Sequence, residues 1–351
     1  MHILHIVGAR PNFMKAAPVM RALQQRGTKQ TLVHTGQHYD ANMSEVFFSQ
    51  LQMPAPDVNL EVGSGSHARQ TAEIMTRLES VVLERKPDVV AVYGDVNSTL
   101  AGALVCAKLL VPVAHIEAGL RSFDRTMPEE INRVVTDRLS DWLFTPSEDA
   151  GTNLQQEGVA EDKIFLVGNV MIDSLLRLLP LAAKTDSPVP AGRYALVTLH
   201  RPANVDSGNA LGSILEELLQ LSAQLTVVFP VHPRTRQRIS DLGMDLGRLH
   251  LLDPLPYMEF LALEQRAAVV ITDSGGVQEE TTYLRVPCLT LRANTERPVT
   301  VTQGTNVVVG NDREKLRLEL GKILDGNFKA GQPPPLWDGH AAERIAEVLC
   351  K

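Results

Sequence analysis

The chain has 351 residues, of which 44% are hydrophobic and 21% charged, and its formal net charge is −7. This length and apolar content suffice for two domains with cores of their own, and the acidic balance excludes a protein that binds nucleic acid or membrane surfaces through a general positive field. Three widely spaced cysteines, Cys106, Cys288 and Cys350, fit neither a disulfide framework nor a cysteine-based zinc site, so we expect a reducing, cytoplasmic location. The apolar run at residues 1–7 is too short for a secretory signal, and no segment reaches the roughly 18 to 20 apolar residues of a membrane span.

The first half of the chain alternates strand patterns with helix patterns. We predict six strands, at residues 2–8, 31–34, 88–94, 112–116, 142–145 and 164–167. We predict helices at residues 14–25, 44–51, 67–86, 128–140, 147–157 and 171–179. The first strand–helix turn lacks the G-x-G-x-x-G spacing that a dinucleotide pyrophosphate needs, so no nicotinamide site is expected there. No other cofactor and no metal are predicted.

The second half repeats this rhythm after a linker at residues 180–193 that is rich in proline and polar residues. Six more strands are predicted, near residues 194–199, 225–229, 248–252, 268–272, 288–291 and 306–309. Regular alternation predicts an α/β protein with two Rossmann-like, doubly wound domains that face a central cleft. We assign residues 1–180 to the N-terminal domain and 181–335 to the C-terminal domain. The last segment, 336–351, carries a helix that is a candidate for packing back onto the N-terminal domain.

Three acidic residues follow predicted strands or open a helix in the first domain. Asp95 and Glu117 come directly after strands, and Glu129 lies in the first turn of a helix opened by Pro128. The carboxyl ends of parallel strands meet at one edge of a sheet, so these acids are expected to converge where ligands bind. The competing interpretation is that each acid merely caps a helix.

The second domain offers groups suited to an anion. Asp273-Ser274-Gly275-Gly276 leads from a strand into a helix, whose free amide groups and glycines favour a phosphate. His200 and His232 each end a strand beside a basic loop. Alternatively, the glycines form an ordinary tight turn and the histidines are structural. Arg10 and Lys15 in the first domain are either phosphate ligands or solvated surface charges.

Taken together, these motifs resemble the non-hydrolysing UDP-N-acetylglucosamine 2-epimerases. The matching pieces lie in family order between residues 8 and 298: Gly8-Ala-Arg-Pro with Lys15, Thr35-Gly-Gln-His, Tyr93-Gly-Asp, His115-Ile-Glu-Ala-Gly-Leu-Arg, Pro128-Glu-Glu-Ile-Asn-Arg, Gly168-Asn, His200-Arg, Asp273-Ser-Gly-Gly-Val-Gln-Glu-Glu and Thr295-Glu-Arg-Pro. The resemblance implies a GT-B-like fold and a homodimer that binds UDP-N-acetylglucosamine. One departure is Ala203, which stands where family members commonly carry glutamate.

The resemblance also implies roles for individual residues. Asp95, Glu117 and Glu129 would surround the sugar and, with His200, carry the chemistry. The nucleotide would be held by Arg10, Lys15, Leu255, Phe260, Ser274, Gly275, Gly276, Glu280 and Arg297, with Glu280 on the ribose and Phe260 beside the uracil. Core packing is the alternative for Phe260. A second, regulatory nucleotide-sugar site would involve Gln37, Arg69, Glu129, Arg201 and His232.

The expected reaction inverts carbon 2 of the sugar. Its hydrogen is not next to a carbonyl, so we expect UDP to be eliminated, leaving 2-acetamidoglucal, and then to be added back after a proton returns to the other face. Three alternatives remain open at this point: a hydrolysing 2-epimerase, a GT-B glycosyltransferase and a non-catalytic nucleotide-sugar sensor.

Overall fold

The computed structural model describes residues 1–37, 51–185, 189 and 192–351, and the helix expected at 44–51 lies almost entirely outside them. The chain divides into two compact units. Unit 1 comprises Met1–Ser174 and Pro335–Lys351, and unit 2 comprises Leu175–Pro334. No helix in the described part of the chain combines the length and the apolar character needed to cross a membrane.

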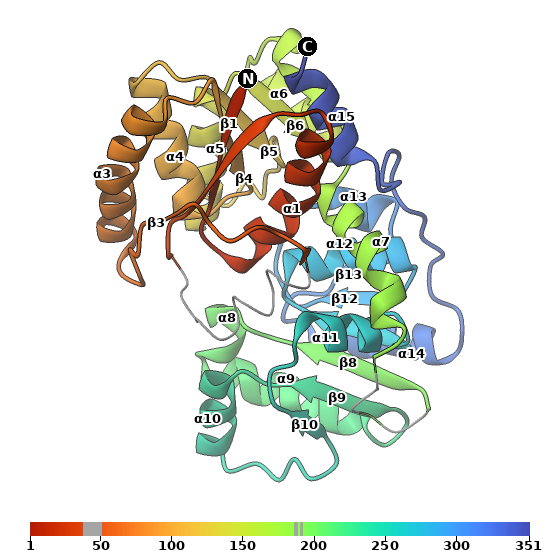
Figure 1. Ribbon diagram of the computed structural model, residues 1–351. Coiled ribbons are helices and arrows are strands. Elements are labelled where there is room, and N and C mark those ends of the chain that lie inside the picture. The colour runs from red at the N-terminus through yellow and green to blue at the C-terminus, as the bar shows by residue number, and fades with distance from the viewer. Residues whose placement is uncertain (38–50, 186–188, 190–191) are drawn as a thin grey trace. The chain divides into compact units, whose positions relative to one another are not determined.

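Unit 1 is built on a seven-stranded parallel sheet with the strand order β3-β2-β1-β4-β5-β6-β7 (Figure 1). Its strands are β1 (His2–Val7), β2 (Lys29–His34), β3 (Val58–Asn59), β4 (Val89–Tyr93), β5 (Val113–Ile116), β6 (Trp142–Thr145) and β7 (Ile164–Leu166). Every residue of β1, β4 and β5 is buried, as expected for central strands covered on both faces. The prediction of six strands in this half was wrong by one, because β3 has only two residues and no pattern of its own.

Helices cover both faces of this sheet. They are α1 (Arg10–Gln25), α3 (His67–Arg85), α4 (Asn97–Lys108), α5 (Pro128–Leu139), α6 (Glu148–Gln156), the start of α7 (Val170–Ala182), α15 (Ala341–Leu349) and the short 3-10 turn η1 (Glu161–Lys163). The chain moves outward in opposite directions from β1 and from β4, so right-handed crossovers place α1 and α4 on opposite faces. Figure 1 shows α1 beside α15, and α3 beside α4.

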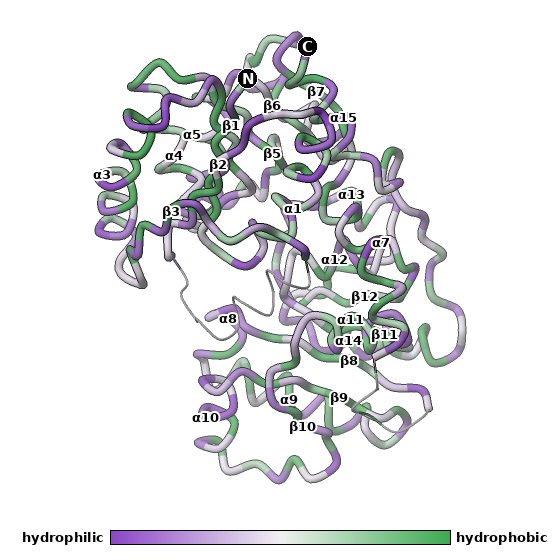
Figure 2. Tube along the Cα trace, viewed as in Figure 1, coloured by the Kyte–Doolittle hydropathy of each residue, from purple (hydrophilic) through white to green (hydrophobic). Residues whose placement is uncertain are grey.

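Helix α3 shows how a sequence pattern sets one of these contacts. Its buried residues are Gln70, Ile74, Leu78 and Val82, one every four positions, which forms a single stripe facing α4 and the sheet. Ser66 caps its first turn by accepting a hydrogen bond from the Arg69 amide. Figure 2 shows hydrophilic residues along the outer side of this helix.

The C-terminal helix α15 belongs to unit 1 and packs against α1. Its first amides, those of Ala341 and Ala342, donate to the Asp173 carboxyl at 3.2 and 2.7 Å. The indole of Trp337, just before the helix, donates to the Pro146 carbonyl at 2.9 Å. These contacts connect residues 169 and 191 positions apart, and they fix the end of the chain to unit 1.

Unit 2 contains a six-stranded parallel sheet with the order β10-β9-β8-β11-β12-β13. The strands are β8 (Tyr194–Thr198), β9 (Thr226–Pro230), β10 (His250–Leu252), β11 (Val269–Thr272), β12 (Cys288–Thr290) and β13 (Asn306–Val308), so the prediction of six strands is confirmed for this half. The helices are α8 (Pro202–Val205), α9 (Gly208–Leu221), α10 (Pro233–Asp241), α11 (Tyr257–Glu264), α12 (Gly275–Leu284), α13 (Pro298–Thr302) and α14 (Arg313–Leu324).

Two helix ends differ from the sequence prediction. Helix α1 begins at Arg10, not Met14, because Pro11 is well tolerated in a first turn. Helix α7 was expected to end at residue 179, but it continues through Pro180 and ends at Ala182. In both sheets the strand order reverses beside the first strand of the unit, at β1/β4 and at β8/β11, and such switch points are where ligands bind in open parallel sheets.

Candidate active site

Asp95 and Glu117 lie at the carboxyl ends of two neighbouring strands of unit 1. Strands β4 and β5 pair in parallel, with Tyr93 opposite Ile116, so the loops that follow them begin side by side. The Gly94 amide donates to the Ile116 carbonyl at 2.9 Å. Glu117 has a φ of 72°, an uncommon value for a residue with a side chain. Both acids therefore belong to one edge of the sheet, as the sequence predicted.

Lys15 is buried and forms an ion pair with Glu117. The Nζ–Oε1 distance is 2.6 Å, and the side chains are 5% and 3% exposed. Gly94 makes room for this ammonium group, since a Cβ atom there would lie 2.7 Å from Nζ. The interpretation of Lys15 as a solvated surface charge is therefore wrong, whereas Arg10, one turn earlier, is exposed.

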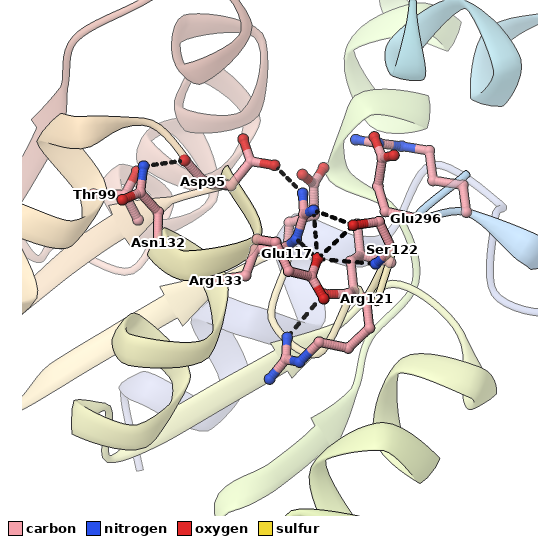
Figure 3. A network of polar contacts seen from close by, with 12 residues as sticks. Asp95, Thr99, Glu117, Arg121, Ser122, Asn132, Arg133 and Glu296 are labelled. Carbon is pink, nitrogen blue, oxygen red and sulfur yellow. Dashed lines mark hydrogen bonds and ion pairs between the residues drawn. The ribbon is translucent and has the colours of Figure 1, made fainter. Parts of the chain in front are cut away.

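Arg133 joins Asp95 to a second carboxyl group. Its guanidinium group donates to Asp95 and, at 2.7 Å, to Glu130 (Figure 3). Glu130 also accepts hydrogen bonds from the amide and hydroxyl of Ser122 at 2.9 and 2.8 Å. Burial alone would raise the pKa of Glu130, but the Ser122 amide and Arg133 lower it below its usual value. Glu129 is half-buried next to this network, and its role stays a prediction.

A buried ionic cluster of His115, Asp137 and Arg121 contacts the loop that follows β5. Asp137 lies 2.6 Å from the Nδ1 atom of His115 and 2.7 Å from Arg121. It also accepts from the Gly119 amide at 3.1 Å, and the other ring nitrogen of His115 contacts the Gly94 carbonyl at 2.8 Å. Burial raises the pKa of Asp137, but His115 and Arg121 outweigh it and hold the pKa below its usual value. This cluster fixes the loops that carry both acids.

The turn after β1 lies close to the same edge. Asn12 accepts hydrogen bonds from the Gly8 and Ala9 amides at 3.1 and 3.0 Å, and donates to the Tyr93 carbonyl at 2.8 Å. A Cβ atom at Gly8 would lie 2.0 Å from the Ser98 hydroxyl, so only glycine fits there. The β1 and β4 loops are thereby joined at the switch point of the sheet.

The predicted regulatory residues of unit 1 have different environments. Gln37 is buried, and its side-chain oxygen accepts from the hydroxyl of Ser98 at 2.7 Å. Arg69 is exposed at the start of α3. The buried partners Asn97 and Gln70 were not predicted; they bond to each other at 2.8 Å beside Gln37.

In unit 2, Asp273 organises the loop that follows β8. It is fully buried and accepts hydrogen bonds from the amides of His200 and Arg201 and from the Asn204 side chain, at 3.0–3.1 Å. The His200 Nδ1 atom lies 2.9 Å from the same carboxylate. Burial raises the pKa of Asp273, but its hydrogen bonds, that to His200 first, lower it below the usual value. His200 itself keeps a side chain that is 57% exposed, so it is both oriented and accessible.

The glycine pair opens helix α12 beside Arg297. A Cβ atom at Gly275 would lie 2.5 Å from the Arg297 guanidinium group, so glycine permits this approach. Arg297 contacts Glu279 at 2.9 Å and also pairs with Glu296. Ser274, Gly275 and Gly276 are half-exposed, and α12 has ten residues. Free amides and a buried arginine therefore meet at one helix N-terminus, which is an arrangement suited to a phosphate.

The remaining predicted residues of unit 2 lie on α11 and α12, in the loop before α11 and at the N-cap of α10. Glu280 is 3% exposed and accepts from the Tyr257 hydroxyl at 2.6 Å. Leu255 and Phe260 are partly buried against the core, as the packing interpretation of Phe260 also expects. His232 is exposed at the N-cap of α10.

Some residues of the site were missed by the sequence reasoning. Arg133, Asp137, Asn204 and Tyr257 all bond to predicted residues or to the loops that carry them. The first three lie inside helices, and Tyr257 begins α11, where an aromatic residue gives no signal of a binding role. Only the motif Pro128-Glu-Glu-Ile-Asn-Arg, which ends in Arg133, gave a signal. The described residues contain no group of three or more His, Cys, Asp or Glu side chains placed to bind a metal ion.

Comparison with known proteins gives a consistent answer. The family model of UDP-N-acetylglucosamine 2-epimerase matches residues 21–350. A UDP-N-acetylglucosamine 2-epimerase from Methanocaldococcus jannaschii is 44% identical, with 99% of each chain covered. A UDP-2,3-diacetamido-2,3-dideoxy-D-glucuronate 2-epimerase from Pseudomonas aeruginosa is 46% identical over the full length of both chains.

Solved structures agree with this result. The crystal structure of the M. jannaschii UDP-GlcNAc 2-epimerase in complex with UDP-GlcNAc and UDP is 43% identical, with a TM-score of 0.92 and coverage of 100% of this chain and 99% of that one. The predicted fold class, an α/β protein with two GT-B-like domains, is confirmed. The chain belongs to the UDP-N-acetylglucosamine 2-epimerase family.

Proposed function

We propose that the protein reversibly converts UDP-N-acetylglucosamine to UDP-N-acetylmannosamine. The observation that carries this proposal is the pair of acids, Asp95 and Glu117, each joined to a buried cation at the ligand edge of unit 1, in a chain of this family. The ion pairs with Lys15 and Arg133 hold these carboxyl groups in defined positions, and a general base must be positioned within hydrogen-bond reach of the proton that it removes.

The nucleotide is assigned to unit 2. The diphosphate would lie at the N-terminus of α12, against Ser274, Gly275, Gly276 and Arg297. Glu280 would accept hydrogen bonds from the ribose hydroxyls, and Leu255 and Phe260 would frame the uracil. The free amides and the arginine support the first assignment, while the others rest on family resemblance.

The proposed chemistry has two halves. A carboxylate of unit 1 removes the proton from carbon 2, the electron pair forms the double bond between carbons 1 and 2, and the bond from carbon 1 to the phosphate oxygen breaks with its electrons leaving on UDP. In the return step a proton reaches carbon 2 from the opposite face while the UDP oxygen re-forms its bond to carbon 1. The general base and the general acid typically each increase the reaction rate by about 10²- to 10⁴-fold.

The individual roles follow from the charges. We assign the base and the acid to the group Asp95, Glu117 and Glu129, and the stabilisation of the departing phosphate to His200. Asp273 supports the last role, because its carboxylate accepts from Nδ1 and so fixes the His200 ring. A protonated imidazole held in this way can donate to the phosphate through Nε2.

A second candidate substrate is UDP-2,3-diacetamido-2,3-dideoxy-D-glucuronate. It is favoured by the 46% identity to a relative named for that activity. The elimination step would be the same at carbon 2, but the sugar carries an extra carboxylate and an extra acetamido group. A direct comparison of the two substrates decides between them.

We also propose that the protein is a homodimer in the cytoplasm and that Gln37, Arg69, Arg201 and His232 contribute to a regulatory nucleotide-sugar site. Family resemblance supports the dimer and the regulatory site. The three free cysteines support a reducing compartment.

Proton NMR in deuterium oxide tests the function. With UDP-N-acetylglucosamine we expect deuterium to enter carbon 2 of both UDP-linked epimers, at a higher kcat/KM than with the diacetamido glucuronate substrate. Release of free N-acetylmannosamine would instead identify a hydrolysing enzyme. No turnover of either substrate would leave a transferase or a sensor.

Two variants and a control locate the chemistry. Asp95→Asn and Glu117→Gln are expected to lower kcat by orders of magnitude while UDP binding largely persists, because most of the proposed nucleotide groups lie in unit 2. Asp88→Asn, at the opposite end of β4, removes an exposed carboxylate of the same strand region and should leave turnover unchanged. A wild-type rate in either site variant would remove that residue from the mechanism.

A further inference from the structure

A buried carboxyl group, that of Glu264, lies in unit 2 and has no part in the site described above. Glu264 is the last residue of α11 and is 0% exposed. Within the part of the chain that the structure describes, neither of its carboxyl oxygens has a conventional hydrogen-bond partner. An isolated charge is very costly in such surroundings, so a carboxyl group placed there stays neutral unless a cation compensates it.

Among the described residues Glu264 forms no ion pair, and the charge that acts on it is that of another carboxyl group. Helix α12 contributes the carboxyl group of Glu280, whose charge acts on Glu264. Strand β12 contributes Cys288, a buried thiol whose pKa burial raises to about 12. Strand β8 contributes Tyr194, whose hydroxyl donates to the Leu263 carbonyl at 2.6 Å.

The position of Glu264 in its helix adds to this effect. The C-terminal end of a helix carries partial negative charge, which disfavours a carboxylate. Burial first, and then the charge of Glu280, raise the pKa of Glu264 well above its usual value. All of these influences act in the same direction.

Glu280 has a different environment. It is 3% exposed, and one of its oxygens accepts from the Tyr257 hydroxyl at 2.6 Å. A carboxylate that accepts a short hydrogen bond from a hydroxyl is stabilised in its ionised form. When two carboxyl groups interact directly, one proton is shared and the better-solvated partner carries the charge.

We propose that Glu264 is a protonated positioning residue, which donates its hydrogen to the Glu280 carboxylate and, with Tyr257, fixes the orientation of that carboxylate. Its role in nucleotide recognition rests on the proposed function, in which Glu280 binds the ribose. A carboxylate held by two donors presents its remaining lone pairs in fixed directions, which favours a ligand with neighbouring hydroxyls. Glu264 would therefore control the preference for ribose over deoxyribose without touching either.

The protonation state is tested by infrared spectroscopy of the full-length protein at pH 7, independently of any ligand. The difference spectrum of wild type minus Glu264→Gln is expected to contain the C=O stretch of one protonated carboxylic acid. Glu314→Gln, which removes an exposed glutamate of α14 in the same unit, should give only a carboxylate band. Absence of the protonated band from the first difference spectrum would overturn the proposal.

The positioning role is tested by the ratio of Kd values for 2′-deoxyuridine diphosphate and UDP, measured by calorimetry between pH 6 and 9. The ratio cancels the titration of the diphosphate, which both ligands share. In wild type the ratio should be high at pH 6, where Glu264 keeps its proton. Glutamine keeps a neutral donor of similar shape, so Glu264→Gln should show a pH-independent ratio within about threefold of the wild-type value at pH 6.

Glu264→Leu separates positioning from packing. Leucine fits a buried apolar site but donates no hydrogen bond, so the ratio should be several-fold lower than in wild type at every pH. A ratio in Glu264→Leu equal to that of wild type at pH 6 would contradict the positioning role. If UDP does not bind at all, the proposed function fails, while the infrared result still decides whether Glu264 is protonated.

Discussion

Replacing Lys15 with methionine tests whether its buried ion pair with Glu117 stabilises unit 1. The charged atoms are 2.6 Å apart, and both side chains are at least nine-tenths buried. Methionine keeps the apolar stem but removes the charge, so the carboxylate stays buried without this cation. Loss of one partner of such a pair costs about 3–5 kcal/mol, and we expect that decrease in the free energy of unfolding of unit 1.

Urea unfolding followed by tryptophan fluorescence measures this loss. The two tryptophans of the chain, Trp142 and Trp337, both belong to unit 1, so the signal reports that unit alone. Lys108→Met, which removes an exposed lysine at the end of α4, serves as the matched control. Its effect should stay within about 0.5 kcal/mol.

The double variant Lys15→Met/Glu117→Gln completes a mutant cycle. Glutamine removes the uncompensated charge, so the double variant should be more stable than the sum of the single changes predicts, by at least about 1 kcal/mol. Two results would refute a stabilising role of this ion pair. One is a stability of Lys15→Met within about 0.5 kcal/mol of wild type, and the other is strict additivity in the cycle.

Three further changes probe the frame of unit 1. Asp173→Ala removes the acceptor of two α15 amides and should lower stability by about 1–2 kcal/mol and speed proteolysis of the C-terminal helix. Gly168→Ala places a Cβ atom 2.0 Å from the Leu336 carbonyl at a φ of 89°, and should cost at least about 2 kcal/mol in the same urea assay. Burial lowers the pKa of His5 from 6.5 to about 4, so this histidine is protonated at a higher pH in the unfolded chain than in the folded one. As the pH falls from 6.5 to 4, the free energy of unfolding of unit 1 should therefore decrease by up to about 3 kcal/mol. His5→Gln should reduce this dependence of stability on pH.

Much of the fold follows from local patterns in the sequence. Continuous apolar runs such as Val89–Tyr93 read as buried parallel strands, and their spacing leaves room only for crossover helices. The same reasoning places Asp95 and Glu117 at one edge, because both follow such runs directly. Strand β3 escaped prediction, since two residues paired to β2 are a product of tertiary contact and not of pattern.

The partners of the site residues were harder to predict. Lys15 and Glu117 are 102 positions apart, and Arg133 reaches Asp95 across 38 positions. A lysine in the first turns of a helix has the same local signal whether it is buried or solvated. The burial of Glu264 was equally hard to predict, because nothing in Leu-Ala-Leu-Glu distinguishes a buried acid from an exposed one at the end of a helix. Only the folded structure brings these charges together.

The central proposal is that the carboxyl groups of unit 1 act on carbon 2 of a UDP-sugar whose diphosphate binds at the N-terminus of α12. A crystal structure with UDP-N-acetylglucosamine bound tests it most directly. The proposal predicts the diphosphate at the N-terminus of α12 and carbon 2 of the same sugar within reach of Asp95, Glu117 or Glu129. A bound nucleotide whose sugar points away from all three acids would contradict it.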